Sequence, residues 1–205
     1  METKIVKYEI AIIGAGGHGR EAADVIRDSG DDVLGYFADD YPGPSVNYLG
    51  KVEDILTKSY IYVIAIGDCK DKKSVFDKIK FSNCYPHQLI HPSAYIGSDC
   101  DIADGVMMYP GAKITNNVKL GLHVHMNVNS VASHDCSIGD FSIVSPGCLL
   151  NGNVTVGEGV FIGTGAIVLP KVKIGDWCIV GAGAVVTEDV PSNSTYVGVP
   201  ARRIK

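Results

Sequence analysis

The stretch "IGDFSIVSPGCLLNGNVTVGEGVFIGTGAIV" (residues 138–168) decides the fold. Every sixth residue in it is apolar, and this pattern continues without a slip from Ile96 to Val186. Four residues after each of these positions stands a second residue that is small or β-branched. Two inward positions in six residues predict one short strand and one corner per hexad. Three hexads close a triangular coil of 18 residues, so the 90 residues of 96–185 predict five coils without a looped-out insertion.

The cysteines fit this repeat better than they fit a redox or metal site. Four of the six occupy the second inward series, and no C-x-x-C pair occurs in the chain. We therefore predict that these four are small buried hydrophobic residues: Cys100, Cys136, Cys148 and Cys178.

The first half of the chain has a different pattern, in which apolar strands alternate with helical segments. Strands are predicted at 8–14, 32–40 and 60–68, and helices at 18–30 and 70–80. Such alternation is typical of a small parallel sheet. The predicted architecture is an α/β Rossmann-like half domain in residues 1–90, followed by an all-β parallel β-helix of hexapeptide repeats in residues 91–205.

Charge and hydropathy exclude some classes of partner. A net charge of −5 argues against a nucleic-acid-binding protein, which needs a basic surface to neutralise phosphates. No apolar run approaches the roughly 18 residues of a membrane-spanning helix. The N-terminal "METKIVKYEIAIIGAGG" leads into a strand without a signal-peptide cleavage motif. We expect a cytoplasmic protein that binds neither nucleic acid nor membrane.

One histidine stands out within the repeats. His134 is the third residue of its hexad, so it falls near a corner and points outward, and Gly152 lies 18 residues later, one coil above it. A base beside an exposed backbone N–H suits acyl transfer, because the base takes a proton from the nucleophile and the N–H stabilises the oxyanion. Asp135 is placed to orient the imidazole. The alternative is a solvated corner histidine without a chemical role.

A glycine-rich loop predicts a nucleotide site in the first half. "GAGGHG" (14–19) follows a strand and opens a helix, where backbone N–H groups bind phosphate. Asp39 and Asp40 end the second strand, where they can accept hydrogen bonds from a ribose or a base. About 85 residues make only one mononucleotide-binding half, so a nucleotide diphosphate sugar fits better than a dinucleotide.

Three further residues invite other interpretations. His123 and His125 form an H-x-H pair, which would suit a zinc-dependent β-helix hydratase. No third histidine falls in a matching column, so we predict no metal site and expect both side chains to be solvated or to lie between subunits. Trp177 occupies an outward position, which favours packing against another subunit or a cofactor.

The chain as a whole resembles the sialic-acid O-acetyltransferase-like family of bacterial sugar acyltransferases, and within it the nucleotide-4-amino-sugar N-acetyltransferases. The resemblance covers nearly all of the chain and rests on "IIGAGGHGREAADVI", "LIHPSAYIG", "NVNSVASHDCSIGDFSIVSPGCLLNGNV", "IGTGAIVLP", "IVGAGAVVTEDV" and "YVGVPARRIK". It implies that the β-helix is left-handed, that the chains form a homotrimer, and that acetyl-CoA binds in the groove between prisms.

The same resemblance implies roles for individual residues. His134 would be the general base, Asp135 would replace an acidic neighbour that is often glutamate, and Gly152 would supply the acetyl-binding N–H. The positions that would face the thioester cofactor are Ile143, Gly152, Thr164 and Ala182. Those that would line the nucleotide-sugar site are Gly16, Gly17, His18, Asp39, Asp40 and Gly67. For His18, a solvated first-turn residue is the alternative.

The implied reaction is acetylation of the 4-amino group of a nucleotide-linked 4-amino-6-deoxy sugar, for a bacterial O-antigen (lipopolysaccharide), capsule or glycoprotein. An O-acetyltransferase acting on sialic acid or another sugar hydroxyl remains an alternative, as does a non-enzymatic nucleotide-binding scaffold. The zinc hydratase is more remote. Because backbone amides recognise phosphate and not base, the sequence does not select among UDP, dTDP and GDP.

Overall fold

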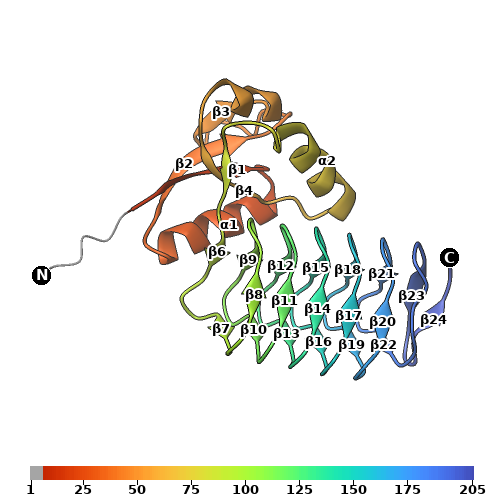
Figure 1. Cartoon of the computed structure of the whole chain (residues 1–205). Coiled ribbons are helices and arrows are strands. Elements are labelled where there is room, and N and C mark those ends of the chain that lie inside the picture. Colours follow the sequence, from red (N-terminus) through yellow and green to blue (C-terminus); the bar gives the residue numbers. More distant parts are fainter. Residues whose placement is uncertain (1–6) are drawn as a thin grey trace, which may run out of the picture.

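The computed structural model describes residues 7–205 as an α/β domain seated on a prism of stacked coils (Figure 1). Residues 1–6 of the expected first domain lie outside the described residues. The α/β domain holds a five-stranded parallel sheet of order β3-β2-β1-β4-β5. Its elements are β1 (Glu9–Ile13), α1 (Gly17–Asp28), β2 (Asp32–Phe37), β3 (Tyr48–Gly50), the 3₁₀ helix η1 (Val52–Thr57), β4 (Ile61–Ile64), α2 (Cys69–Ile79) and β5 (Tyr85–Pro86).

The alternation of side chains along β1 explains why the two helices cover opposite faces of this sheet. Ile10 and Ile12 pack in one cluster with the buried residues of α1, whereas Ala11 and Ile13 pack in another with those of α2. The three predicted strands and two predicted helices are thus confirmed. The short outer strands β3 and β5 were not predicted, because three and two residues carry no usable hydrophobic period.

From residue 89 onward the chain winds around three flat faces. The first face contains β6 (Leu89–Ile90), β9 (Met107–Met108), β12 (His125–Met126), β15 (Ile143–Val144), β18 (Phe161–Ile162), β21 (Ile179–Val180), β23 (Thr195–Val197) and the antiparallel β24 (Arg202–Arg203). The second face contains β7 (Tyr95–Ile96), β10 (Lys113–Ile114), β13 (Val131–Ala132), β16 (Leu149–Leu150), β19 (Ile167–Val168) and β22 (Val185–Val186). The third face contains β8 (Asp101–Ile102), β11 (Lys119–Leu120), β14 (Ser137–Ile138), β17 (Thr155–Val156) and β20 (Lys173–Ile174).

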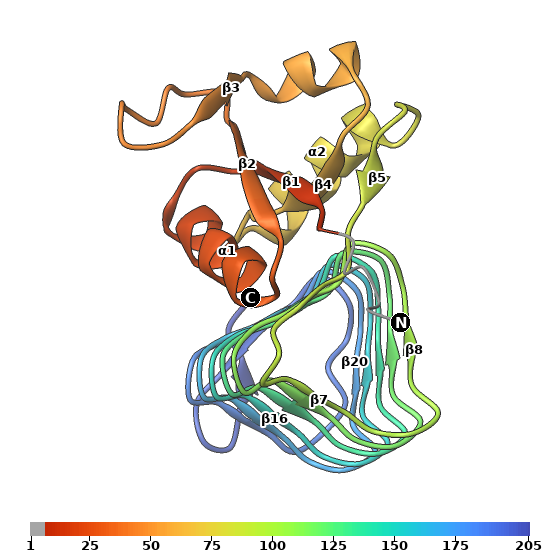
Figure 2. The same ribbon diagram turned by 90° about the vertical axis from the view of Figure 1, so that its left-hand side faces the viewer.

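The register of the faces confirms the predicted coil length. Paired residues differ by 18 from Leu89 and Met107 through Val168 and Val186, without an insertion, and the spacing falls to 16 in the last coil, where Val190 pairs with Ile174 and β23 joins β21. Seen along the prism axis, the chain passes from β7 to β8 anticlockwise as it recedes from the viewer, so the coils are left-handed (Figure 2). Because β6 already pairs with β9, the β-helix begins just before the boundary expected between residues 90 and 91.

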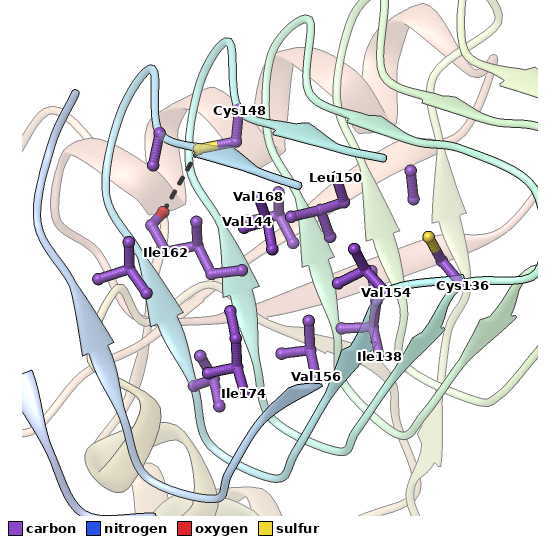
Figure 3. Close-up of a cluster of buried hydrophobic side chains, with 14 of the residues drawn as sticks. Cys136, Ile138, Val144, Cys148, Leu150, Val154, Val156, Ile162, Val168 and Ile174 are labelled. Atoms are coloured by element: carbon purple, nitrogen blue, oxygen red, sulfur yellow. Dashed lines mark hydrogen bonds between the residues drawn. The ribbon is translucent and has the colours of Figure 1, made fainter. Parts of the chain in front are cut away.

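The inward residues of all three faces form one continuous core, as the hexad pattern predicts (Figure 3). Cys136, Cys148 and Cys178 lie within it, and Cys100 packs against its first coil. The Cys148 thiol points along the interior toward the carbonyl of Ile162, 3.6 Å away. The structural role predicted for these thiols is therefore confirmed. None of the helices in residues 7–205 is long and apolar enough to span a bilayer.

The α/β domain docks on the corner between the third and first faces. Phe76 of α2 packs on His123 and Phe141, with ring centroids 4.9 and 5.3 Å apart. Nε2 of His18 lies 3.1 Å from Nδ1 of His125. His123 and His125 are both fully buried, so the expectation that they are solvated or lie between subunits was wrong. The hexad pattern locates corners but does not show which corner another domain covers.

This domain interface is rich in basic groups whose charged forms are disfavoured by burial. Burial lowers the pKa of Lys72 to about 7 and that of His123 to about 3, and it takes the pKa of His125 well below the usual value. His18 also has a lowered pKa, although Glu21 opposes that shift. Both ring nitrogens of His123 are buried without a hydrogen-bond partner. Each unpartnered nitrogen costs stability.

These shifts predict a loss of stability in acid. A histidine with a lowered folded-state pKa takes up a proton below about pH 6.5 in the unfolded chain but not in the folded one, which costs about 1.4 kcal/mol per pH unit for each histidine. At Lys72 the unfolded chain binds more protons than the folded one only between the usual lysine pKa of 10.5 and about pH 7. Lys72 therefore adds little to the loss of stability below pH 7. The midpoint of urea unfolding should therefore fall steeply between pH 6.5 and pH 5.

The variant His123→Phe tests this account, because a phenyl ring retains the stacking on Phe141 and Tyr62 without the unpartnered nitrogens. We expect the variant to be more stable at pH 7.5 by about 1–2 kcal/mol. Its unfolding free energy should also fall less steeply below pH 6.5 than that of the wild type. Urea titrations at pH 7.5, 6.5 and 5.5 give the unfolding free energy of each protein. An equal fall of that free energy with pH in the variant and the wild type would contradict this account of His123.

Candidate active site

His134 lies at the corner between β13 and β14, on the side of the prism away from the α/β domain (Figure 2). Its side chain is 60% exposed, and its Nδ1 lies 2.8 Å from Oδ2 of Asp135. The other carboxylate oxygen of Asp135 accepts a hydrogen bond of 2.8 Å from the side-chain amide of Asn117. Both hydrogen bonds lower the pKa of Asp135, and the bond to His134 has the larger effect. The carboxylate is therefore held charged against Nδ1, and Nε2 is left to face outward.

The backbone at this corner explains why an aspartate is suited to the position. Asp135 has φ of 62°, in the left-handed region that Asp and Asn adopt more readily than other side-chain-bearing residues. Residues one coil away in either direction share this conformation, with φ of 54° at Asn117 and 63° at Asn153. In this conformation the carboxylate of Asp135, although shorter than that of a glutamate, reaches the imidazole of its neighbour.

Gly152 lies directly against the imidazole, as the 18-residue spacing predicts. A Cβ built on Gly152 would stand 2.5 Å from both Cε1 and Nε2 of His134, so only glycine leaves room for the ring in this position. Within residues 7–205 no acceptor takes the backbone N–H of Gly152, whereas those of Asn151 and Asn153 bond to neighbouring coils. A base and a free N–H donor thus lie side by side at an exposed corner.

The positions expected to face the cofactor lie in three separate places, one of which is Gly152 at the His134 corner. Thr164 and Ala182 are exposed and stack one coil apart at the corner between the first and second faces. Ile143 is separate from them, because it lies on the first face with only 3% of its surface exposed, next to Cys69 and Lys72 of α2. The described chain therefore presents Thr164 and Ala182 to a ligand but not the side chain of Ile143.

The predicted nucleotide residues are only partly brought together. A pocket of about 500 Å³ at the carboxyl edge of the sheet is lined by Gly16, Asp39 and Asp40, together with Gly14, Ala15, Tyr41, Ser74 and Lys78. Gly16 caps the N-terminus of α1, where backbone N–H groups favour a phosphate. Asp39 also accepts a hydrogen bond from the backbone N–H of Val52, so one of its oxygens fixes the loop.

The other three candidates lie outside this pocket. Gly17 is part of the first turn of α1 but does not line the pocket, and Gly67 lines a neighbouring one. His18 turns toward the β-helix, where its ring stacks on Tyr109 with centroids 5.1 Å apart. The ring of His18 is neither part of this pocket nor solvated, because the docked β-helix offers it a partly buried aromatic partner, and its role in nucleotide-sugar binding stays a prediction.

Asn117 is a residue that the sequence interpretation missed, although it lies 18 residues before Asp135. Replacing it with glycine keeps the left-handed backbone accessible and removes only the amide that holds Asp135. We expect kcat of the predicted acyl transfer to fall about 10-fold, because Asp135 loses one of the two hydrogen bonds that hold it in place. Asn153→Gly is the matched control, one coil beyond Asp135 in the same column, and should leave kcat within a factor of two. Equal rates for the two variants would show that Asp135 needs no support from Asn117.

Comparison with known proteins connects these features to an activity. Residues 9–79 match the PglD N-terminal domain, and residues 153–188 match the bacterial transferase hexapeptide repeat. The chain is 30% identical to PerB from Caulobacter crescentus, whose structure contains CoA and GDP-perosamine, over 99% of this chain and 100% of that one, with a TM-score of 0.91. The chain belongs to the nucleotide-amino-sugar N-acetyltransferase family.

Two other relatives agree with this assignment. The acetyltransferase domain of PglB from Neisseria gonorrhoeae, solved with acetyl coenzyme A, has a TM-score of 0.92 and 27% identity, over 97% of this chain and 100% of that one. GDP-perosamine N-acetyltransferase from Escherichia coli O157:H7 is 32% identical over 134 residues. That match spans 60% of this chain and 61% of the relative, so it covers about three fifths of each.

For this sugar N-acetyltransferase family member, the comparisons confirm the predicted family and both halves of the predicted fold. The zinc-hydratase interpretation gains no support, because His123 and His125 are buried under the α/β domain and no cluster of three His, Cys, Asp or Glu side chains capable of holding a metal occurs in residues 7–205. The individual site residues remain predictions, which the geometry at His134 supports most directly.

Proposed function

We propose that this chain transfers an acetyl group from acetyl-CoA to the 4-amino group of a nucleotide-linked 4-amino-6-deoxy sugar. The observation that carries the proposal is the corner at which His134, held by Asp135, lies against the free N–H of Gly152. A nucleotide-sized pocket at a glycine-rich loop, in the same chain, supports a nucleotide-linked acceptor.

The chain's own groups supply two functions in this reaction. Nε2 of His134 accepts the proton that the attacking amine must lose, while Asp135 stabilises the imidazolium that results. The N–H of Gly152 donates to the oxygen of the thioester carbonyl as negative charge develops there. Thiolate is a good leaving group, so the acetyl group can pass directly to the amine without an acyl-enzyme intermediate.

We further propose that the active site is shared between copies of the chain in a homotrimer. The second face carries an outward apolar column with little charge, made of Val131, Leu149, Ile167 and Val185. The third face instead presents Asp101, Lys119, Ser137, Thr155 and Lys173 at equivalent positions. Burial of the second face about a three-fold axis would remove this column from water.

Such a trimer would also bring the separated parts of the site together. The second face is bounded on one edge by the His134 corner and on the other by the corner of Thr164 and Ala182. When three copies turn this face toward a common axis, each His134 corner meets the Thr164 corner of the next copy. The groove between prisms then has a base on one wall and the expected cofactor column on the other.

The remaining finer expectations belong to the same proposal and rest on the family resemblance. They are a cytoplasmic location and a role in building lipopolysaccharide, capsule or glycoprotein glycans.

The test is CoA release from acetyl-CoA by the purified protein, with UDP-, dTDP- and GDP-linked 4-amino-6-deoxy sugars offered in parallel. Turnover with one of them would support the proposal and identify the nucleotide. A free sialic acid in a fourth reaction tests the hydroxyl acceptor. Release of CoA only in that reaction, or in none, would reject the amino-sugar assignment.

A further inference from the structure

Trp177 is a bulky corner residue that the proposed chemistry does not use. It lies at the corner between β20 and β21 with φ of 57°, the left-handed conformation that the corner residues of the other coils share, such as His123 and Phe141 with φ of 53° and 59°. Its ring lies over Gly159, one coil earlier, where a Cβ would collide with the indole. The left-handed backbone belongs to the repeat, so the observation that bears on the role of Trp177 is the space that Gly159 leaves for its ring.

The same corner column explains how a slot arises beside this ring. His123 and Phe141 fill the column beneath Phe76 of α2, and their rings stack with centroids 5.8 Å apart. Gly159 occupies the next position of this column and has no side chain to fill it. The ring of Trp177, one coil further along, bounds the resulting space on the far side. A pocket of about 480 Å³ results, with Gly67 and Asp68 on one wall and Phe161 and Ile179 on the floor.

This slot continues the nucleotide pocket. Ile66 lines the nucleotide pocket and Gly67, the next residue, lines the slot. A shallower depression along α2 joins them on the other side, because it shares Ser74 and Lys78 with the nucleotide pocket and Lys70 and Trp177 with the slot. A group attached to a diphosphate at the glycine-rich loop therefore enters the slot next.

The walls match a deoxy amino sugar. Trp177, Phe161 and Ile179 offer an aromatic and an aliphatic surface to the carbon face and methyl group of such a ring. Asp68 offers a carboxylate: its Oδ1 caps α2 by accepting from the backbone N–H groups of Lys70 and Asp71, at 2.8 and 3.0 Å. Its Oδ2 makes no hydrogen bond within the described residues and is available to a sugar hydroxyl or amine.

Resting on the function proposed above, we propose that Trp177, seated over Gly159, forms the wall that selects the sugar of the nucleotide-linked substrate. The slot and the expected cofactor column of Thr164 and Ala182 lie at opposite ends of β18 and β21. The outer surface of these two strands, which Phe161 and Ile179 form, therefore connects the slot to the expected cofactor column.

Trp177 is the only tryptophan of the chain, so its fluorescence reports on the slot directly. Titration of the full-length protein with GDP-perosamine and with its UDP- and dTDP-linked counterparts should change the emission for the sugar that binds. The matching free nucleoside diphosphate should bind, as calorimetry reports, without that change. CoA alone should also leave the emission unchanged.

Variants connect the signal to turnover. Trp177→Asn removes the ring and introduces a residue type that suits this backbone, because Asn193 has φ of 58° at the same corner one coil later. The protein should therefore remain at least as stable. We expect the KM for the nucleotide sugar to rise about 10-fold, the KM for acetyl-CoA to stay within a factor of two, and free nucleotide to bind as before. Gly159→Ala should give the same KM effect by displacing the ring. Gly147→Ala, with φ of 68° and no atom near its Cβ, controls for backbone strain and should leave the sugar KM unchanged.

Three results would overturn the proposal. In the first, a nucleotide sugar that binds in the calorimeter leaves the emission unchanged. In the second, CoA alone changes the emission, and Trp177→Asn raises the KM for acetyl-CoA but not for the sugar, which would assign the slot to the adenine. In the third, no nucleotide sugar binds or reacts at all, which rejects the proposed function and the slot's role with it. The first two results leave the proposed function intact.

Discussion

Replacement of His134 with alanine is expected to lower kcat of acetyl transfer by about 10²- to 10⁴-fold, the usual contribution of a positioned general base. The side chain is 60% exposed and contacts Asp135, so its loss removes a proton acceptor without opening a cavity. The midpoint of thermal unfolding should therefore change little. The KM values should also stay close to those of the wild type, because Nε2 acts in the transition state.

Asn116→Ala is a suitable control for this experiment. Asn116 holds the same place in the coil below His134 and is exposed, and its side chain bonds only to that of Ser98 among the described residues. It should retain kcat within a factor of two. Initial rates of CoA release, measured at saturating concentrations of both substrates, make the comparison. Activity that survives in His134→Ala would mean that the amine loses its proton to water, and the corner would then serve only to bind substrate.

The second large effect is expected for Gly152→Ala. The new methyl group would stand 2.5 Å from Nε2 of His134, so the imidazole must swing away from both Asp135 and the N–H of residue 152. We expect kcat to fall at least about 100-fold, because the base and the oxyanion donor lose their mutual geometry. Gly152 does not have a positive φ, so alanine suits the backbone and the protein should lose little stability.

A double-mutant cycle separates this explanation from a simple blockage of the site. In the His134→Ala background the ring is gone and the methyl group has nothing to displace, so Gly152→Ala should cost little more. Stopped-flow or steady-state rates of the four proteins are sufficient for the cycle. A full additional loss in the double variant would show that the methyl group obstructs the substrate, and that Gly152 was not selected to accommodate the imidazole.

The sequence predicted the repeat with few errors because every inward position must be small or apolar for a prism to close. The strict 18-residue period also predicts that His134 and Gly152 are neighbours. The same period places Asn117 next to Asp135, and the structure shows a hydrogen bond between them. The sequence did not predict that His18, His123, His125 and the side chain of Ile143 lie at the contact between the two domains. All four depend on which corner the α/β domain covers, and that contact joins residues far apart in sequence without a local pattern.

Trp177 illustrates a different limit. Its outward position followed from the hexad, but a choice between subunit packing and ligand packing was not possible from the sequence. Two structural features favour ligand packing over subunit packing: Gly159 has no side chain beneath the ring, and the loop of Gly67 and Asp68 lies opposite it. A glycine is common in these repeats, so one whose role is to leave space for a neighbouring indole carries no recognisable signal.

The constant spacing of the coils restricts how this architecture can vary. Insertion or deletion of one residue in the prism would turn inward side chains outward, whereas a whole coil of 18 residues can be added or removed without disturbing its neighbours. Each such step would move the His134 corner along the axis by about 4.8 Å relative to the glycine-rich loop. The distance between the glycine-rich loop and the His134 corner can therefore change only in steps of one coil. Finer adjustment to a substrate depends on the single side chains that lie between them.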